Sequence, residues 1–283
     1  MLWDTMTQYL KSWFVFPGLA GHLLVIGIAL AIVFGAIWLT SHWPPLFKKP
    51  WLWAVLVMSA FLTLLALIFI QIPLQYYSGS ALEHFWSQTA LTQWLLLAGI
   101  PSVLISGLVQ EGAKMLPMVF WWWSSGKKID PKMGLAIGAL AGAGFAIFEA
   151  TWAHNQVFMS GWTWNLVSTS GYQALLPFWD RFWAVAMHIA VSALVGYGLA
   201  KGKGWQFYLI AAALHSTINY TIVIYRKGSL TFNQVEILLA GAAALITLFV
   251  LWLRWRENKE ETPTALIEPT ETAEPDKPAG IDV

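Results

Sequence analysis

Seven long apolar segments run through this sequence and restrict what the chain can fold into. Each is about 20 residues long, the length at which a helix crosses the ~30 Å hydrocarbon core of a bilayer. Only 11% of the 283 residues are charged, against roughly 25% in soluble domains. We therefore predict an all-α polytopic membrane protein, a bundle of about seven transmembrane helices. The predicted spans are 18–40, 51–72, 94–123, 133–152, 182–200, 205–225 and 236–253.

The composition also excludes several functions. The chain contains no cysteine, which excludes disulfides, thiolate nucleophiles and cysteine-ligated metals. The net charge is +1, so the chain lacks the basic surface that binds nucleic acid. No internal repeat of about 20 to 50 residues is visible, which excludes solenoids and other repeat arrays.

The two ends of the chain differ from the transmembrane domain, which we predict to cover residues 18–254. Residues 1–17 lack a basic start and a cleavage site, so we expect a segment in the membrane interface rather than a signal peptide. Residues 255–283 are rich in Thr, Pro, Glu and Ala. Because such a segment has too little apolar surface to form a core, we expect a disordered cytoplasmic tail.

Lysines are concentrated in alternate loops, and this predicts the orientation of the chain. The first, third and fifth loops carry seven lysines, whereas the second and fourth carry none. Basic loops remain on the cytoplasmic side, so we expect the N-terminus outside and the C-terminus in the cytoplasm. Arg226 and Lys227 are exceptions, because their loop is predicted to lie outside.

Six conspicuous polar side chains lie within the predicted spans. An ionisable group in hydrocarbon costs at least a few kcal/mol, so it usually faces the bundle interior and indicates a functional site. At 1.5 Å per residue, all six lie roughly 14 to 24 Å from the predicted cytoplasmic ends of their helices. We therefore expect one polar layer near the midplane of the membrane. Its members are Glu111, Lys114, Glu149, His188, His215 and Asn219.

Residue spacing predicts how these helices pack. Residues four apart share a helix face, so His215 and Asn219 can address one point. The fourth and fifth spans each carry small residues at four-residue intervals, a pattern that lets helix backbones approach closely. Glu111 with Lys114 would also fit an internal ion pair that only fixes packing. The two expected ridges consist of Gly134, Gly138, Gly142 and Ala146, and of His188, Ser192, Gly196 and Ala200.

Three short motifs in this layer resemble those of the PrsW-type intramembrane proteases, within the wider superfamily that includes the CAAX prenyl proteases. Gln110 to Lys114 resembles the Glu-Glu-x-x-Lys/Arg signature, and Phe145 to Glu149 resembles the Phe-x-x-x-Glu/His motif. His215 to Asn219 resembles the His-x-x-x-Asn motif, and His188 stands where PrsW-like chains often carry another histidine. The resemblance covers about residues 95–225 and implies an intramembrane peptidase.

The chain departs from the family pattern at one important position. The family usually has two adjacent glutamates, of which the first is generally assigned as the base that activates water, but here that position is Gln110. The asparagine that often follows the second motif is replaced by Ala150. Three readings stay open: Glu111 supplies the carboxylate, Glu149 supplies it, or this chain has lost hydrolysis and kept binding.

The resemblance implies a mechanism for peptide hydrolysis. We expect Glu111 to be the base, with His188 and Glu149 orienting the water, while His215 and Asn219 stabilise the oxyanion. Gln110, Lys114 and Phe145 would support these groups. The alternative is a zinc site formed by His188, His215 and either Glu111 or Glu149. The chain lacks a His-Glu-x-x-His motif, so a reaction without a cofactor is favoured.

The expected substrate is a single-span membrane protein, such as an anti-sigma factor, cut in or near the bilayer. Short loops and the family resemblance favour a plasma (inner) membrane. Two other functions compete with this prediction. A non-catalytic membrane scaffold of the same fold would tolerate Gln110. A proton-coupled transporter would also carry buried Glu, His and Lys residues, but such proteins commonly show internal repeats or paired interrupted helices.

Overall fold

The computed structural model describes residues 2–260, which are helical apart from short turns and loops. Seven helical segments are long and apolar enough to cross a membrane, which confirms the predicted number of spans. No strand occurs within residues 2–260, so the predicted all-α fold is confirmed. The segments are Gly21–Ser41, Leu52–Phe85, Leu95–Ser124, Pro131–Met159, Asn165–Ala200, Gly204–Arg226 and Phe232–Glu257.

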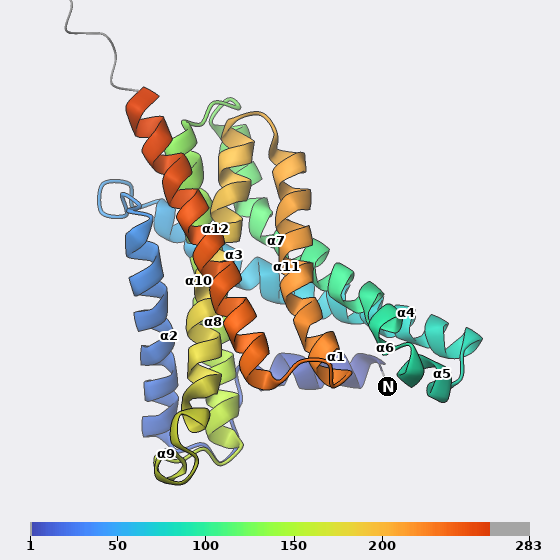
Figure 1. The fold of residues 1–283 in the computed structure, drawn as a ribbon. Coiled ribbons are helices and arrows are strands. Elements are labelled where there is room, and N and C mark those ends of the chain that lie inside the picture. The colour runs from blue at the N-terminus through green and yellow to red at the C-terminus, as the bar shows by residue number, and fades with distance from the viewer. Residues whose placement is uncertain (1, 261–283) are drawn as a thin grey trace, which may run out of the picture.

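Two helices form the centre of the bundle (Figure 1). Helix α8 (Pro131–Met159) packs lengthwise against α10 (Leu176–Ala200), and their middle turns are almost fully buried. The predicted small-residue ridge lies in this contact, because a Cβ atom added to Gly134, Gly138 or Gly142 would overlap the backbone of α10. The two backbones are therefore in direct contact, and this contact places His188 of α10 beside α8.

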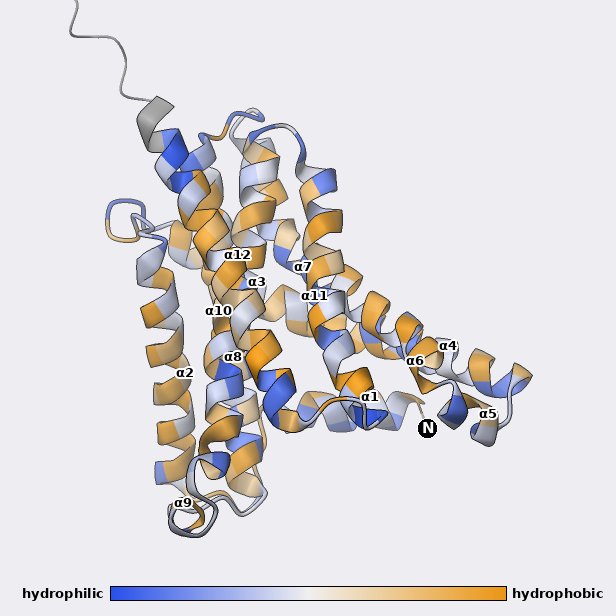
Figure 2. Ribbon diagram, in the orientation of Figure 1, coloured by the Kyte–Doolittle hydropathy of each residue, from blue (hydrophilic) through white to orange (hydrophobic). Residues whose placement is uncertain are grey.

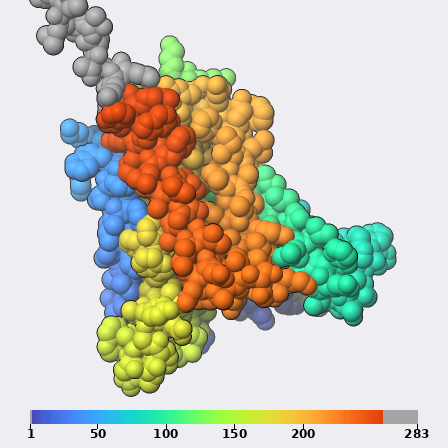
Figure 3. Space-filling model, in the orientation of Figure 1, coloured from blue at the N-terminus to red at the C-terminus, as the bar shows by residue number. Residues whose placement is uncertain are grey.

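Five further helices surround this pair. Helices α2 (Gly21–Ser41) and α3 (Leu52–Ala66) pack against α8, α12 (Phe232–Glu260) packs against α10, and α7 (Ile100–Ser124) and α11 (Gly204–Arg226) pack against each other. Figure 2 shows that α2 and the middle of α12 are hydrophobic over most of their length, as expected of faces in contact with lipid. In Figure 3, α12 lies beside α11 and covers much of the viewed face.

The second span is longer than the predicted 51–72. It continues to Phe85 through a π-helical turn, η1 (Leu67–Gln71), and helix α4 (Ile72–Phe85). Pro73 follows this π-helical turn and does not end the helix. Together with α5 (Gln88–Gln93) and α6 (Leu95–Ala98), α4 extends away from the central helices (Figure 1).

The ends of the described chain are also helical. Residues Leu2–Ser12 form α1, and the following Trp13 is buried and stacks on Trp152 of α8 with 5.1 Å between ring centroids. The N-terminal segment is thus anchored to the bundle. At the other end α12 continues to Glu260, so residues 255–260 are helical although we expected them in the tail. The rest of the predicted tail, 261–283, lies outside the described residues.

A short excursion joins α8 to α10. It contains α9 (Asn165–Ser170) and the 3-10 helix η2 (Gly171–Leu175), and it sits at one end of the bundle in Figure 1. The nitrogen Nε1 of Trp162 donates a hydrogen bond of 2.7 Å to the carbonyl oxygen of Ala174 within this excursion. This bond joins the beginning of the excursion to its end, so the end of α8 and the start of α10 lie close together.

Candidate active site

Four helices bring polar side chains to one place inside the bundle. Helix α7 carries Glu111 and Lys114, α8 carries Glu149, α10 carries His188, and α11 carries His215. Hydrogen bonds and ion pairs connect all five side chains. Five of the six residues that we expected in one layer therefore form one continuous cluster, and the sixth, Asn219, bonds to Ser106 instead.

Glu111 accepts two of these hydrogen bonds at a single oxygen atom. Its Oε1 lies 2.5 Å from Nζ of Lys114 and 2.6 Å from Nδ1 of His215. Glu111 is 1% exposed, and Lys114 is fully buried. The second oxygen, Oε2, has no hydrogen-bond partner among the described residues. A carboxylate in such a place is stable only because a cation and a second donor compensate its lost hydration.

His188 links this buried pair to Glu149. Its Nδ1 lies 3.0 Å from Nζ of Lys114, and its Nε2 lies 3.2 Å from Oε2 of Glu149. An ammonium group can only donate, so Nδ1 accepts and Nε2 carries the proton that is donated to Glu149. Phe145 is fully buried and meets the His188 ring edge to face at 5.5 Å between centroids. This contact holds the plane of the imidazole ring.

A cavity of about 110 Å³ opens beside the cluster. Because one water needs a space of roughly 10 to 15 Å³, the cavity has room for water. The side chain of Glu149 is 21% exposed, whereas that of Glu111 is 0% exposed. Glu149 thus lies on the cavity wall, whereas Glu111, which we expected to be the base, does not. The polar residues of the cavity wall are Gln110, Glu149, Asp180, Arg181, His188, His215, Asn219 and Thr221.

Asn219 and Gln110 meet at a serine that the sequence analysis did not single out. The Nδ2 atom of Asn219 donates to Oγ of Ser106 at 3.2 Å, and Nε2 of Gln110 donates to the same oxygen at 3.1 Å. Gln110 also donates to Oε1 of Gln71 in the π-helical turn at 3.2 Å. The four-residue spacing between Ser106 and Gln110 was the available signal for Ser106. The position of Gln71 followed only from the packing of the second span.

Arg181, which was not among the predicted site residues, also contacts the cluster. Its guanidinium pairs with the carboxylate of Asp180. In addition, its Nη1 lies 3.5 Å from Oε2 of Glu149. The side chain is 23% exposed and lines the cavity. One oxygen of Glu149 is therefore held by both His188 and Arg181.

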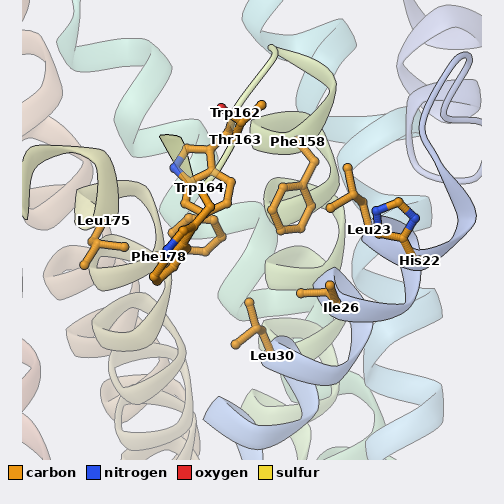
Figure 4. Close-up of a pocket in the computed structure, with 10 residues that line it drawn as sticks. All are labelled: His22, Leu23, Ile26, Leu30, Phe158, Trp162, Thr163, Trp164, Leu175 and Phe178. Atoms are coloured by element: carbon orange, nitrogen blue, oxygen red, sulfur yellow. The ribbon is translucent and has the colours of Figure 1, made fainter. Parts of the chain in front are cut away.

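A larger cavity elsewhere lacks this chemistry. It has a volume of about 670 Å³ and lies where α2 faces the end of α8 and the start of α10 (Figure 4). Figure 4 shows mainly hydrophobic and aromatic side chains around it, including Phe158, Trp162 and Phe178, and His22 is its one imidazole. No carboxylate lines it. The small polar cavity, not the large apolar one, is thus the candidate active site.

The cluster also contains the donors of a metal site. Glu111, His188 and His215 each present one ligand atom, and these atoms lie within 4.8 Å of one another. Zinc binds imidazole nitrogen and carboxylate oxygen at about 2.0 to 2.2 Å. The three side chains are therefore of types that bind zinc, and their ligand atoms are nearly close enough together to share one ion. However, Lys114 uses Oε1 of Glu111 and Nδ1 of His188. Its ammonium would have to withdraw for these atoms to bind a metal.

Comparison with known proteins gives one match. The model of a family described as "PrsW family intramembrane metalloprotease" matches residues 48–253, more than two thirds of the chain. The match includes every residue of the cluster and the cavity. No curated protein and no solved structure matches the chain.

Proposed function

The chain belongs to the PrsW family of intramembrane proteases, and on that premise we propose that it hydrolyses peptide bonds of single-span membrane proteins with Glu149 as the base. One observation carries this proposal: Glu149 lies on the wall of a polar cavity inside a bundle of transmembrane helices. His188, His215 and Asn219 line the same cavity. A membrane-embedded carboxylate with access to water is what hydrolysis within the bilayer requires.

Glu149 is held in a position that suits proton transfer. Its Oε2 faces Nε2 of His188 and Nη1 of Arg181, so the carboxylate cannot rotate freely. No bond to Oε1 is found within residues 2–260, which leaves this oxygen for a water in the cavity. Glu149 would take a proton as the water oxygen bonds to the scissile carbonyl carbon, and would return it to the nitrogen as the C–N bond breaks.

The oxyanion formed on the substrate needs hydrogen-bond donors, which α11 provides in this proposal. Asn219 supplies an amide, and His215 lies one helical turn away. Because Nδ1 of His215 is bonded to Glu111, Nε2 can donate only if the ring is protonated.

Lys114 has a structural reason to be present. It neutralises Glu111 beneath the cavity and orients Nδ1 of His188, so that the proton of this ring lies on Nε2 and points at Glu149. In this arrangement Glu111 and Lys114 organise the site without touching the substrate. A zinc ion held by Glu111, His188 and His215 would instead act as a Lewis acid on the scissile carbonyl.

The test of the base uses purified protein in lipid nanodiscs and a set of synthetic single-span peptides, with products identified by mass spectrometry. We expect Glu149→Gln to lower turnover by about 10² to 10⁴, the usual contribution of a general base. Glu83→Gln is the matched control, because Glu83 is an exposed carboxylate on α4 outside the cavity. If turnover persists in Glu149→Gln but is lost in Glu111→Gln, the base is Glu111 and not Glu149.

A second experiment separates the two catalytic types. Zinc is measured in the purified protein by mass spectrometry, and turnover is compared before and after treatment with a chelator. We expect turnover to persist in the chelated protein. One zinc per chain, with activity that is lost on chelation and restored by zinc, would assign the reaction to a metal held by Glu111, His188 and His215. Absence of cleavage in every preparation, with cellular function unchanged in Glu149→Gln, would favour a scaffold.

The orientation in the membrane is part of the proposal, with the C-terminus in the cytoplasm of a plasma (inner) membrane. The chain has no cysteine, so single introduced cysteines can be labelled without background. Ser124→Cys lies at the end of α7 and Ser229→Cys in the loop after α11, and both positions are exposed. We expect a membrane-impermeant maleimide to label position 229 in intact cells and position 124 only after lysis.

A further inference from the structure

Gln110 lines the cavity and carries a buried oxygen without a hydrogen-bond donor. The residue is 6% exposed, and both hydrogens of its amide are used, one by Gln71 and one by Ser106. Its Oε1 has no hydrogen-bond partner among the described residues, yet Gln110 lines the same cavity as Glu149. A buried acceptor without a donor costs about 1 to 3 kcal/mol of free energy, and a donor that enters with the substrate would remove this cost.

A chain of amides determines which end of Gln110 is left unpaired. The Nε2 atom of Gln75 lies 2.9 Å from the backbone carbonyl oxygen of Ser102, which can only accept. The oxygen of Gln75 must therefore face Nε2 of Gln71, at 3.5 Å. The oxygen of Gln71 in turn accepts from Nε2 of Gln110. Reversing Gln110 would set two amide oxygens against each other, so its oxygen is the unpaired end.

We propose that Oε1 of Gln110 accepts a hydrogen bond from a backbone N–H of the substrate segment in the cavity, and that Gln71 and Gln75 are positioning residues that keep this oxygen available. The proposal deepens the proposed function and rests on it, because it names the group of the substrate that the same site binds. A transmembrane segment must unwind locally before its peptide bond is attacked, and the freed N–H groups then need acceptors.

The same chain of amides explains why glutamine, rather than glutamate, suits position 110. A carboxylate there would lose both donated hydrogen bonds and would face the oxygen of Gln71. The side-chain oxygen of Gln71 and those of a glutamate at position 110 would then repel each other. Both positions are buried, with Gln71 8% and Gln110 6% exposed. The π-helical turn η1 supplies this feature by turning Gln71 toward α7.

The first test compares kinetic constants of variants in nanodiscs. Gln110→Leu and Gln110→Glu should each raise KM for a cleaved peptide by about tenfold, the effect of one lost neutral hydrogen bond, with kcat changed by less than about twofold. Gln75→Leu should raise KM by a smaller factor, because the side-chain amides of Gln71 and Gln110 could then reverse, and Oε1 of Gln110 would be available only part of the time. Gln93→Leu is the matched control, since Gln93 is an exposed amide on α5. A Gln110→Glu variant with higher kcat than the wild type would overturn the proposal.

The second test identifies the bond itself. A labelled single-span peptide is made as a set in which one backbone N–H at a time is replaced by an ester oxygen, and its binding is measured with the Glu149→Gln variant so that cleavage does not interfere. One ester position should weaken binding by about tenfold when Gln110 is present and by less than about twofold in Gln110→Leu. Equal losses in both backgrounds at every position would mean that Oε1 binds water, and would refute the proposal.

The failures of the two proposals remain distinguishable. If no peptide is cleaved by the wild-type protein, hydrolysis fails but the binding measurements with ester peptides still decide the role of Gln110. Suppose instead that cleavage occurs and depends on Glu149, while every ester position weakens binding equally with and without Gln110. In that case the hydrolysis proposal stands and the proposed bond to a substrate N–H is refuted.

Discussion

The ion pair between Glu111 and Lys114 offers a quantitative test of the buried cluster. Nζ of Lys114 lies 2.5 Å from Oε1 of Glu111, and both side chains are 0% exposed. Removing one partner of a buried pair typically destabilises a protein by about 3 to 5 kcal/mol, because the remaining charge stays in the interior without compensation. For a domain of this size each kcal/mol shifts the melting temperature by about 2 to 4 °C. Lys114→Met should therefore lower Tm by roughly 6 to 20 °C.

A double-mutant cycle shows whether that loss comes from the pair. Glu111→Gln alone leaves the Lys114 ammonium buried with His188 as its remaining partner, so we expect a loss of similar size. The double variant Glu111→Gln with Lys114→Met removes both charges and should recover most of the stability. Lys128→Met controls for the loss of an exposed lysine. The assay is thermal unfolding in detergent, followed by tryptophan fluorescence.

Two outcomes would refute this reasoning. A double variant whose Tm falls by the sum of the two single losses would show that the charges do not interact. A Lys114→Met variant that unfolds within about 2 °C of the wild type would show that Glu111 is not a compensated buried carboxylate.

The remaining predictions concern packing and pH. Gly138→Ala should destabilise the protein by about 1 to 3 kcal/mol, because the added Cβ would overlap the backbone at Ser192. Gly241→Ala on α12 meets open space and should stabilise the protein by up to about 1 kcal/mol. Thermal unfolding should therefore show changes in stability of opposite sign for the two variants. Burial lowers the pKa of His42 to about 4, more than its bond to Trp38 O raises it. The neutral form is therefore the folded form, and stability should be complete above pH 6.5 and fall by about 3 kcal/mol as the pH drops to 4. Unfolding measured from pH 7.5 to 4 in wild type and His42→Phe checks this, and an equal pH dependence in both would contradict it.

Much of the architecture was predictable because the membrane restricts the choices. In hydrocarbon every backbone polar group must be satisfied within its own segment, so a run of about 20 apolar residues can hardly be anything but a helix. The Gly138 ridge was readable for a related reason: without a hydrophobic force between helices, close packing depends on small residues at regular intervals. The structure places that ridge against α10.

The extent of the second span was not predictable from hydropathy. Leu52–Phe85 continues past the apolar run into residues such as Gln75 and Glu83, and the helix persists through a π-helical turn whose Gln71 bonds to Gln110 on another helix. That bond joins residues 39 positions apart, and hydropathy does not report such a contact.

The sequence by itself determined which residues are candidates for chemistry, because an ionisable side chain in a bilayer is too costly to occur without a partner or a purpose. Glu111, Glu149, His188 and His215 stood out on that ground alone. Only the tertiary structure decided their order in space: Glu111 is fully buried in its pair with Lys114 and does not line the cavity, whereas Glu149 does. The reason is that depth along a helix follows from residue counting, whereas exposure to a cavity depends on which neighbouring helices cover each face.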